Sequence, residues 1–135
     1  DNGSLGANMD IVIDARGPII KLISCSPPND SCVDVPRSGH AIVESTETGI
    51  AYIILSSGSY AVPVDNLASI TELIEDAELD NRWNSVDILA NTPIELPATG
   101  LRQGDYKFFA VDALGNLSDE AIGDIRGGIM NVKWE

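Results

Sequence analysis

The chain has 135 residues, which fits one domain with a single buried core, and its 44% hydrophobic and 21% charged residues argue against wholesale disorder. Its 8 basic and 21 acidic residues give a net charge of −13, which repels phosphate backbones and anionic membrane faces, so we expect no nucleic-acid partner. No apolar run approaches the roughly 20 residues that a membrane-spanning helix needs, and we expect no direct membrane span.

Short β-branched runs, separated by turn residues, recur along the chain and predict a mainly β protein. We expect strands at residues 11–13, 19–24, 41–45, 50–55, 60–64, 85–90, 94–96, 105–112 and, last, near 125–134. Pro18, between the first two runs, indicates either the entry to a strand or a break between two short strands. About seven short strands with turns at this spacing favour a β-sandwich, because a single helix cannot supply the crossovers of a parallel sheet.

The first residues are expected to lie outside the sandwich. Residues 1–17 form an N-terminal segment or linker in this interpretation, and residues 18–135 form the sandwich domain. The segment Gly3-Ser4-Leu5-Gly6 weakly echoes residues 114–118 near the end of the chain. The N-terminal residues are therefore either the tail of a preceding repeat or only similar to these residues by chance.

The two cysteines, Cys25 and Cys32, are separated by residues that favour turns, Pro-Pro-Asn-Asp at 27–30. Such a turn brings the two ends of the segment together, so we expect a disulfide, with two free thiols as the alternative. A zinc site is disfavoured because the chain has one histidine and no second cysteine pair. A disulfide would place the protein in an oxidising compartment, extracellular or at the cell surface.

Residues 65–81 break the β pattern and predict one short helix, over roughly residues 67–79. Apolar residues recur there at intervals of three and four, namely Leu67, Ile70, Leu73, Ile74 and Ala77. Ser69 and Glu72 match a capping box, which indicates the N-terminal part of a helix. The opposite face is acidic, and we expect it to be solvated, with a binding surface as the alternative.

A stretch near the end of the chain carries the most information about the fold. Tyr106, Phe108 and Ala110 fall on one face of the predicted strand at 105–112, and apolar Phe109 and Val111 fall on the other, so this strand is expected to be central. After it, Asp112 to Asn116 predict a turn in which Gly115 takes a positive φ.

This stretch resembles the penultimate strand and last hairpin of bacterial immunoglobulin-like and cadherin-like repeats, which read L-x-x-G-x-Y-x-hydrophobic-x-A-x-D-x-x-G-N-x-S. The matching residues are Leu101, Gly104, Tyr106, Phe108, Ala110, Asp112, Gly115, Asn116 and Ser118. The resemblance implies an immunoglobulin-like β-sandwich, and Tyr106 looks like the tyrosine-corner residue that ties a loop to a strand. The predicted helix and the cysteine loop depart from the pattern, so no subfamily is assigned.

Repeats of this kind are strung end to end in surface proteins, often with Ca²⁺ near the junctions between domains. The resemblance therefore implies a tentative Ca²⁺ site with oxygen ligands from Asp14, Asp112, Asn116 and Asp119, although the simpler and favoured explanation of Asp112 and Asn116 is that they only form the turn. A second calcium candidate is the spacing of Asp76, Glu78, Asp80 and Asp87, which matches an EF-hand loop without its glycine.

Two further patterns, a possible sorting signal and a single histidine, do not indicate a function. Residues 96–100 match the L-P-x-T-G cell-wall sorting signal, but a polar turn and a strand follow them in place of an apolar span. For catalysis the chain offers one histidine, His40, with no nucleophile elbow and no base partner for either cysteine. We therefore expect no enzymatic activity.

The sequence thus predicts a non-catalytic structural or adhesion module of a larger extracellular protein, whose partners are neighbouring domains of the same chain. The alternative is a domain that binds carbohydrate or protein, a glycan or another surface protein. In that case Trp83 and Tyr60 are the expected ligand-binding residues, although both are equally compatible with the core.

Overall fold

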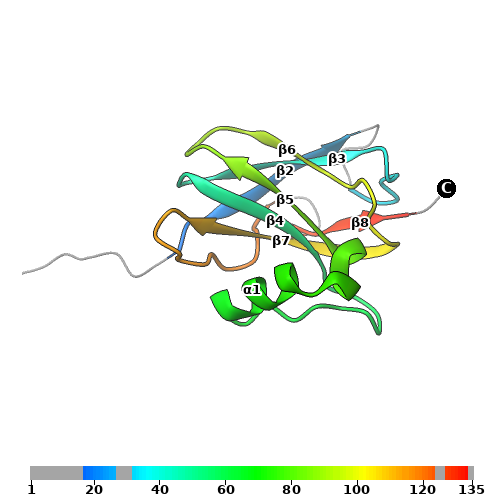
Figure 1. The fold of residues 1–135 in the computed structure, drawn as a ribbon. Helices are drawn as coiled ribbons and strands as arrows, with labels where there is room; N and C mark the ends of the chain where they lie inside the picture. Colours follow the sequence, from blue (N-terminus) through cyan, green and yellow to red (C-terminus); the bar gives the residue numbers. More distant parts are fainter. Residues whose placement is uncertain (1–16, 27–31, 124–126, 134–135) are drawn as a thin grey trace, which may run out of the picture.

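The computed structural model has a mainly β fold (Figure 1), and it describes residues 17–26, 32–123 and 127–133. Seven strands lie in these residues: β2 (Ile20–Ser26), β3 (His40–Ser45), β4 (Gly49–Leu55), β5 (Trp83–Ile88), β6 (Ile94–Pro97), β7 (Gly104–Asp112) and β8 (Met130–Val132). The connection from β4 to β5 contains the helix α1 (Leu67–Glu75) and a 3₁₀ helix, η2 (Ala77–Arg82). A mainly β protein with a short inserted helix, as the sequence predicted, is confirmed.

The strands form two antiparallel sheets. The first sheet has the order β2-β3-β6, and the second has the order β5-β4-β7-β8. Strand β7 lies between β4 and β8, which confirms that the strand with apolar residues on both faces is central. In Figure 1 the labelled parts of β2, β3 and β6 lie above those of β4, β7 and β8.

The two sheets pack face to face around one hydrophobic core. Leu22 and Val43 enter this core from the three-stranded sheet, and Ile53 and Phe108 enter it from the four-stranded sheet. All four side chains are buried. Along β2 and β3 the buried positions largely alternate with less buried ones, as the two-residue period of a strand requires. Each large apolar side chain buried in this way stabilises the fold by about 1.5–3 kcal/mol.

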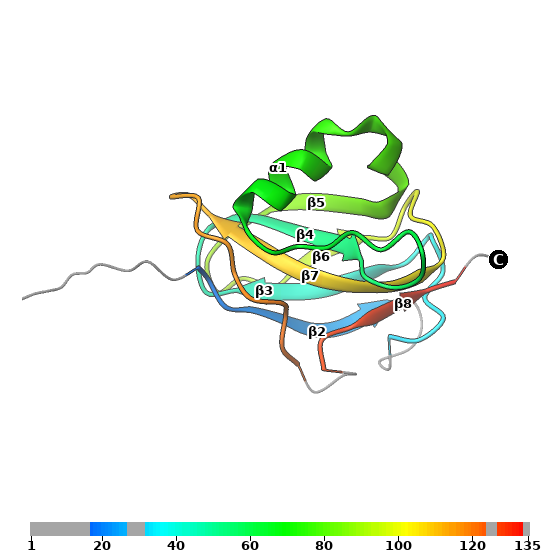
Figure 2. The same ribbon diagram turned by 90° about the horizontal axis from the view of Figure 1, so that it is seen from below.

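A second apolar cluster lies on the outer face of the four-stranded sheet, beneath α1 (Figures 1 and 2). Ile70 and Leu73 of the helix pack in one cluster with Tyr52 and Ile54 of β4 and Phe109 of β7. This cluster explains why β4 is buried on both of its faces. The described residues therefore form three layers. The helix packs on the four-stranded sheet, which in turn packs on the three-stranded sheet.

The helix begins at the predicted residue, Leu67, but its capping residue differs from the prediction and it ends earlier, at Glu75. Asn66 caps its N-terminus, and the Asn66 side chain accepts a hydrogen bond from the backbone N–H of Ser69, 3.1 Å away. The predicted capping box at Ser69 and Glu72 is therefore wrong, because the helix starts two residues before Ser69, at Leu67. Ile70 and Leu73 are buried as expected, whereas Ile74 is 46% exposed.

The predicted strand at residues 60–64 is also wrong. Val62 and Val64 are apolar because they pack against the cluster beneath α1, and Pro63 between them has no N–H to offer a neighbouring strand. The predicted strand at residues 11–13 lies outside the described residues. Of the segment predicted near 125–134, the structure shows strand β8 at Met130–Val132.

The connection from β7 to β8 bridges the two sheets along one side of the sandwich. The backbone N–H of Ala121 donates to the carbonyl of Phe108 in β7 at 2.8 Å. The next residue, Ile122, donates to Ile20 at 3.0 Å and accepts from Leu22 at 2.9 Å, and both of these residues belong to β2. The connection thus links the four-stranded sheet to the edge of the three-stranded sheet.

The sandwich has two ends, which we name by a residue at each. The Gly17 end is where β2 begins. The Tyr60 end is where β4 stops and β7 begins, since Leu55 pairs with Tyr106 there. The strand register also places the last residue of β2, Ser26, and the last residue of β8, Val132, at the Tyr60 end. The described chain therefore begins at one end and finishes at the other (Figure 1).

Candidate functional site

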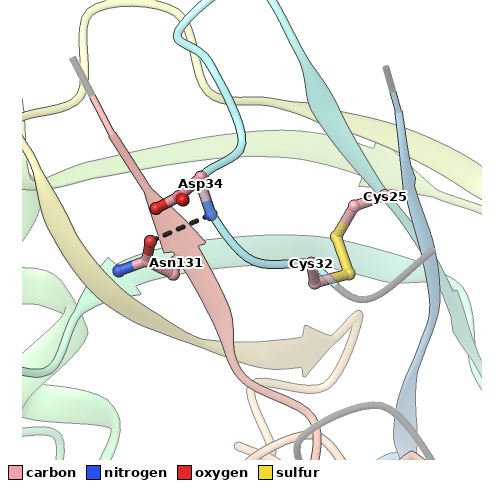
Figure 3. Close-up of a disulfide and its surroundings, with 4 residues drawn as sticks. All are labelled: Cys25, Cys32, Asp34 and Asn131. Carbon is pink, nitrogen blue, oxygen red and sulfur yellow. Dashed lines mark hydrogen bonds between the residues drawn. A yellow bond between two sulfur atoms is a disulfide. The ribbon is translucent and has the colours of Figure 1, made fainter. Parts of the chain in front are cut away.

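The predicted disulfide is confirmed. Cys25 near the end of β2 is bonded to Cys32, and their Cα atoms are 5.2 Å apart (Figure 3). Cys32 begins a short segment that runs beside β8, where the backbone N–H of Asn131 donates to the carbonyl of Cys32 at 2.8 Å. The bond therefore joins the three-stranded sheet to the edge of the four-stranded sheet at the Tyr60 end.

Asn131 is a structural residue that sequence reasoning missed. Its side-chain oxygen accepts a hydrogen bond from the backbone N–H of Asp34 at 3.0 Å (Figure 3), and its amide nitrogen donates to the Asp105 carboxylate at 2.9 Å. Cys32 and Asp34 both have a positive φ, which the disulfide and these hydrogen bonds help to hold. The only sequence signal was one polar residue between Met130 and Val132.

The predicted turn after β7 is confirmed, and the carboxylate of Asp112 organises it. One carboxylate oxygen accepts from the backbone N–H groups of Leu114 and Asn116, each at 2.9 Å. The other oxygen accepts from the side-chain amide of Asn116 at 3.1 Å. Gly115 has a φ of +86°, as expected. Burial works to raise the pKa of Asp112, but the hydrogen bonds from Asn116 and Leu114 outweigh it and hold this pKa below its usual value.

The predicted calcium ligands are only partly brought together. Asp112 and Asn116 contact each other within the turn, whereas Asp119 is exposed and lines a groove of about 500 Å³ beside Gly17 and Glu120. Asp14 lies outside the described residues. In the described part of the chain, no group of three or more His, Cys, Asp or Glu side chains is arranged to hold a metal ion.

The EF-hand-like spacing falls on regular structure. Asp76 caps η2, and its carboxylate accepts from the backbone N–H of Glu78 at 3.0 Å. Asp80 lies within this 3₁₀ helix, and Asp87 is an exposed residue of strand β5. The pattern therefore runs from the cap of a 3₁₀ helix, through that helix, to a strand, which is not the single loop that an EF-hand requires.

The two aromatic residues predicted to bind ligand have different surroundings. Trp83 is half-buried in the cluster beneath α1, where its ring centroid is 6.1 Å from that of Tyr52. Tyr60 is 48% exposed at the end of β4. The guanidinium carbon of Arg102 is 3.7 Å from the centroid of the Tyr60 ring, and that of Arg82 is 5.0 Å from it. Sequence reasoning missed both arginines, which lie far from Tyr60 along the chain.

Tyr106 ties the connection between β6 and β7 to the core. Its buried hydroxyl donates to the backbone carbonyl of Arg102 at 2.5 Å, four residues upstream. Burial raises the pKa of Tyr106 far above its ordinary value, although the charge of Arg102 acts in the opposite direction. The hydroxyl therefore stays protonated and able to donate under all ordinary conditions.

His40, the single histidine, begins strand β3 and faces strand β6. Its Nε2 atom lies 3.6 Å from a carboxylate oxygen of Glu95. This pair is a contact between neighbouring strands, and it assigns no catalytic role to His40.

No family model, curated protein or solved structure matches this chain. Within the residues that the structure describes, no helix combines the length and the apolar character needed to cross a membrane.

Proposed function

We propose that this chain is an immunoglobulin-like module that acts as a non-catalytic structural or adhesive unit of a larger extracellular protein. The order of its strands carries the proposal. Counted along the described chain, the first, second and fifth strands form one sheet, and the fourth, third, sixth and seventh form the other. A constant-type immunoglobulin domain has the same order, except that its fourth strand pairs with the fifth. Transfer of that one edge strand to the third strand interconverts the two.

The hydrogen bond of Tyr106 supports the same fold independently. In immunoglobulin-like domains a tyrosine near the start of the sixth strand bonds back to the backbone a few residues upstream. Tyr106 lies near the start of the sixth described strand, β7, and its hydroxyl bonds the carbonyl of Arg102. The corner tyrosine and the strand order are separate features, so a chance match in both is less plausible than in either.

Two features support a structural role outside the cell. The described chain begins and finishes at opposite ends of the sandwich, which suits a unit linked end to end with neighbouring domains (Figure 1). The disulfide between Cys25 and Cys32 suits an oxidising compartment. Binding of calcium at the Gly17 end, with Asp119 as a ligand, remains a prediction.

Stretching single molecules in two geometries tests the structural role. Handles at the two chain ends pull along β2 and β8 and load many interstrand hydrogen bonds at once, because those bonds lie across the strands. Handles at the N-terminus and at Leu114, an 86% exposed residue changed to cysteine, both pull at the Gly17 end and peel strands apart in turn. We expect a clearly higher unfolding force in the first geometry. Equal forces in the two geometries would refute the load-bearing role.

A further inference from the structure

Two arginines at the Tyr60 end lack the partners that the composition of the chain would lead one to expect. The chain has 21 acidic residues against 8 basic ones, so most arginines have carboxylates to choose from. Neither Arg82 nor Arg102 forms an ion pair with a carboxylate of the described residues, whereas Lys107 pairs with Glu120 at 2.7 Å. The two guanidinium groups are stacked instead on the ring of Tyr60.

The backbone around this stack is fixed on two sides. The backbone N–H of Arg102 donates to the carbonyl of Asn81 at 2.9 Å, and the carbonyl of Arg102 accepts from the Tyr106 hydroxyl. Arg82 directly follows Asn81, and its Nη1 atom lies 3.5 Å from the backbone carbonyl of Tyr60. The stack therefore joins three segments that are distant in sequence, and little side-chain entropy remains to be lost on binding.

The donors of these arginines remain largely unused. A guanidinium that contacts an aromatic ring through its face keeps its N–H donors in the plane of the group. The Nε atom of Arg82 is buried and has no hydrogen-bond partner among the described residues. Buried donors without partners are uncommon, because the missing hydrogen bond to water is not replaced. A carboxylate has two acceptor oxygens and matches the planar fork of an arginine.

We propose that Arg82 and Arg102, held on the ring of Tyr60, form a binding site for a carboxylate of an acidic segment in a protein partner. The site is independent of the load-bearing role. Arginine and tyrosine are enriched among the residues that dominate protein–protein interfaces, and Tyr60 is 48% exposed. A polyanionic glycan is disfavoured, because the net charge of −13 repels a chain of many negative charges more than a single carboxylate.

Titration of the ¹⁵N-labelled protein with a model carboxylate tests the proposal. N-acetylglutamate amide is added at constant pH and ionic strength, and the Nε–Hε signals of Arg82 and Arg102 are followed by NMR. We expect both signals to shift and to saturate in the millimolar range. N-acetylglutamine amide has the same shape without the charge, and we expect no saturable shift with it.

Three variants separate a built site from general electrostatic attraction. Arg102→Lys keeps the charge but loses the fork, and we expect roughly tenfold weaker binding, the value of about one charge-assisted hydrogen bond. Arg82→Lys is expected to act in the same direction. Tyr60→Ala keeps both charges and removes the ring, and we expect a loss of similar size. The melting temperature and the backbone spectrum of each variant establish that the fold is kept.

Two results would overturn the proposal. Absence of binding of N-acetylglutamate amide would assign the arginines a purely structural role in joining the three segments, and binding that is unchanged in Tyr60→Ala would reduce it to general electrostatic attraction. Binding of glucuronate at least tenfold tighter than N-acetylglutamate amide at the same signals would replace the protein partner with an acidic sugar.

Discussion

Charged side chains have different roles at the two ends of the sandwich. At the Gly17 end, the carboxylate of Asp112 is turned inward and holds a turn through three hydrogen bonds. At the Tyr60 end, Arg82 and Arg102 are held on an exposed ring without a carboxylate of the described residues as partner. In this acidic chain one carboxylate thus serves the fold, whereas two of the scarce basic residues, Arg82 and Arg102, stack on a tyrosine and form no ion pair with the described residues.

The ends also differ in how they are held together. The Tyr60 end contains the disulfide and the buried hydroxyl of Tyr106, whereas the backbone at the Gly17 end is closed by a hydrogen-bonded turn. If this comparison is right, substitutions at the Tyr60 end cost more stability than substitutions at the Gly17 end.

The largest loss of stability is expected from removing the disulfide. Replacement of both Cys25 and Cys32 by serine should lower the free energy of unfolding by about 2.5 kcal/mol, the loop-closure value for a segment of this length. Both positions are buried, so the polar serines add to the loss. Urea denaturation measures the change. The wild type under reducing conditions is the control and should lose a similar amount. A double variant as stable as the wild type would contradict the role of the bond.

The next largest effect is expected from Tyr106→Phe. This change leaves the ring in the core but deprives the carbonyl of Arg102 of its hydrogen bond, which should cost about 2 kcal/mol. Tyr52→Phe is the matched control, because the Tyr52 hydroxyl forms no hydrogen bond with the described residues and its loss should have little effect. Equal destabilisation by the two changes, measured by urea denaturation, would argue against a corner tyrosine.

A smaller and pH-dependent effect is expected at the Gly17 end. Folding lowers the pKa of Asp112, so its charged form stabilises the fold above the ordinary aspartate value of about 3.9, and this contribution is lost as the pH falls through the lowered folded-state pKa. Asp112→Asn should lower the free energy of unfolding by about 1 kcal/mol near pH 7, because the side-chain amide of the new asparagine would face the amide donor of Asn116.

The same difference should shrink on acidification. Unfolding of the wild type and of Asp112→Asn is compared in urea at neutral pH and at a pH below the ordinary aspartate pKa. Asp119→Asn, at an exposed position, serves as the control and should follow the wild type in its pH dependence. A gap between wild type and Asp112→Asn that stays constant over this range would show that the charge of Asp112 does not hold the turn.

The smallest effect is expected from calcium. A weak extracellular site at a free calcium concentration equal to its Kd adds about 0.4 kcal/mol, which corresponds to a rise of roughly 1–2 °C in melting temperature over the value in EDTA. Asp119→Asn should abolish that rise. Identical melting curves in EDTA and in millimolar Ca²⁺ would remove calcium from the Gly17 end.

Local chemistry made much of the fold predictable. Two cysteines flanking turn residues, and a strand apolar on both faces, were enough to indicate the disulfide and the central position of β7. The turn of Asp112 and Gly115 was equally local. In each case the residues that carry the signal lie within a few positions of one another, so composition and spacing carry the information.

The cluster at Tyr60 was not predictable for the opposite reason. Arg82 and Arg102 are brought to Tyr60 only when the β4–β5 and β6–β7 connections meet at one end of the sandwich. The alternation at residues 60–64 was misleading for a related reason, since Val62 and Val64 are apolar to cover the helix cluster and not to pair in a sheet. An alternation of apolar and polar residues indicates that every second side chain is buried, but it does not say whether a sheet or a helix cluster buries them.

The link from β7 to β2 has a consequence for behaviour at high concentration. An exposed strand edge is a template on which another molecule can add a strand, and such pairing starts aggregation. Ile122 pairs with the carbonyl of Ile20 and with the N–H of Leu22, so this acceptor and this donor of β2 are not available to a second molecule. This part of β2 is thereby protected from adding a strand of a neighbouring molecule when the protein is concentrated.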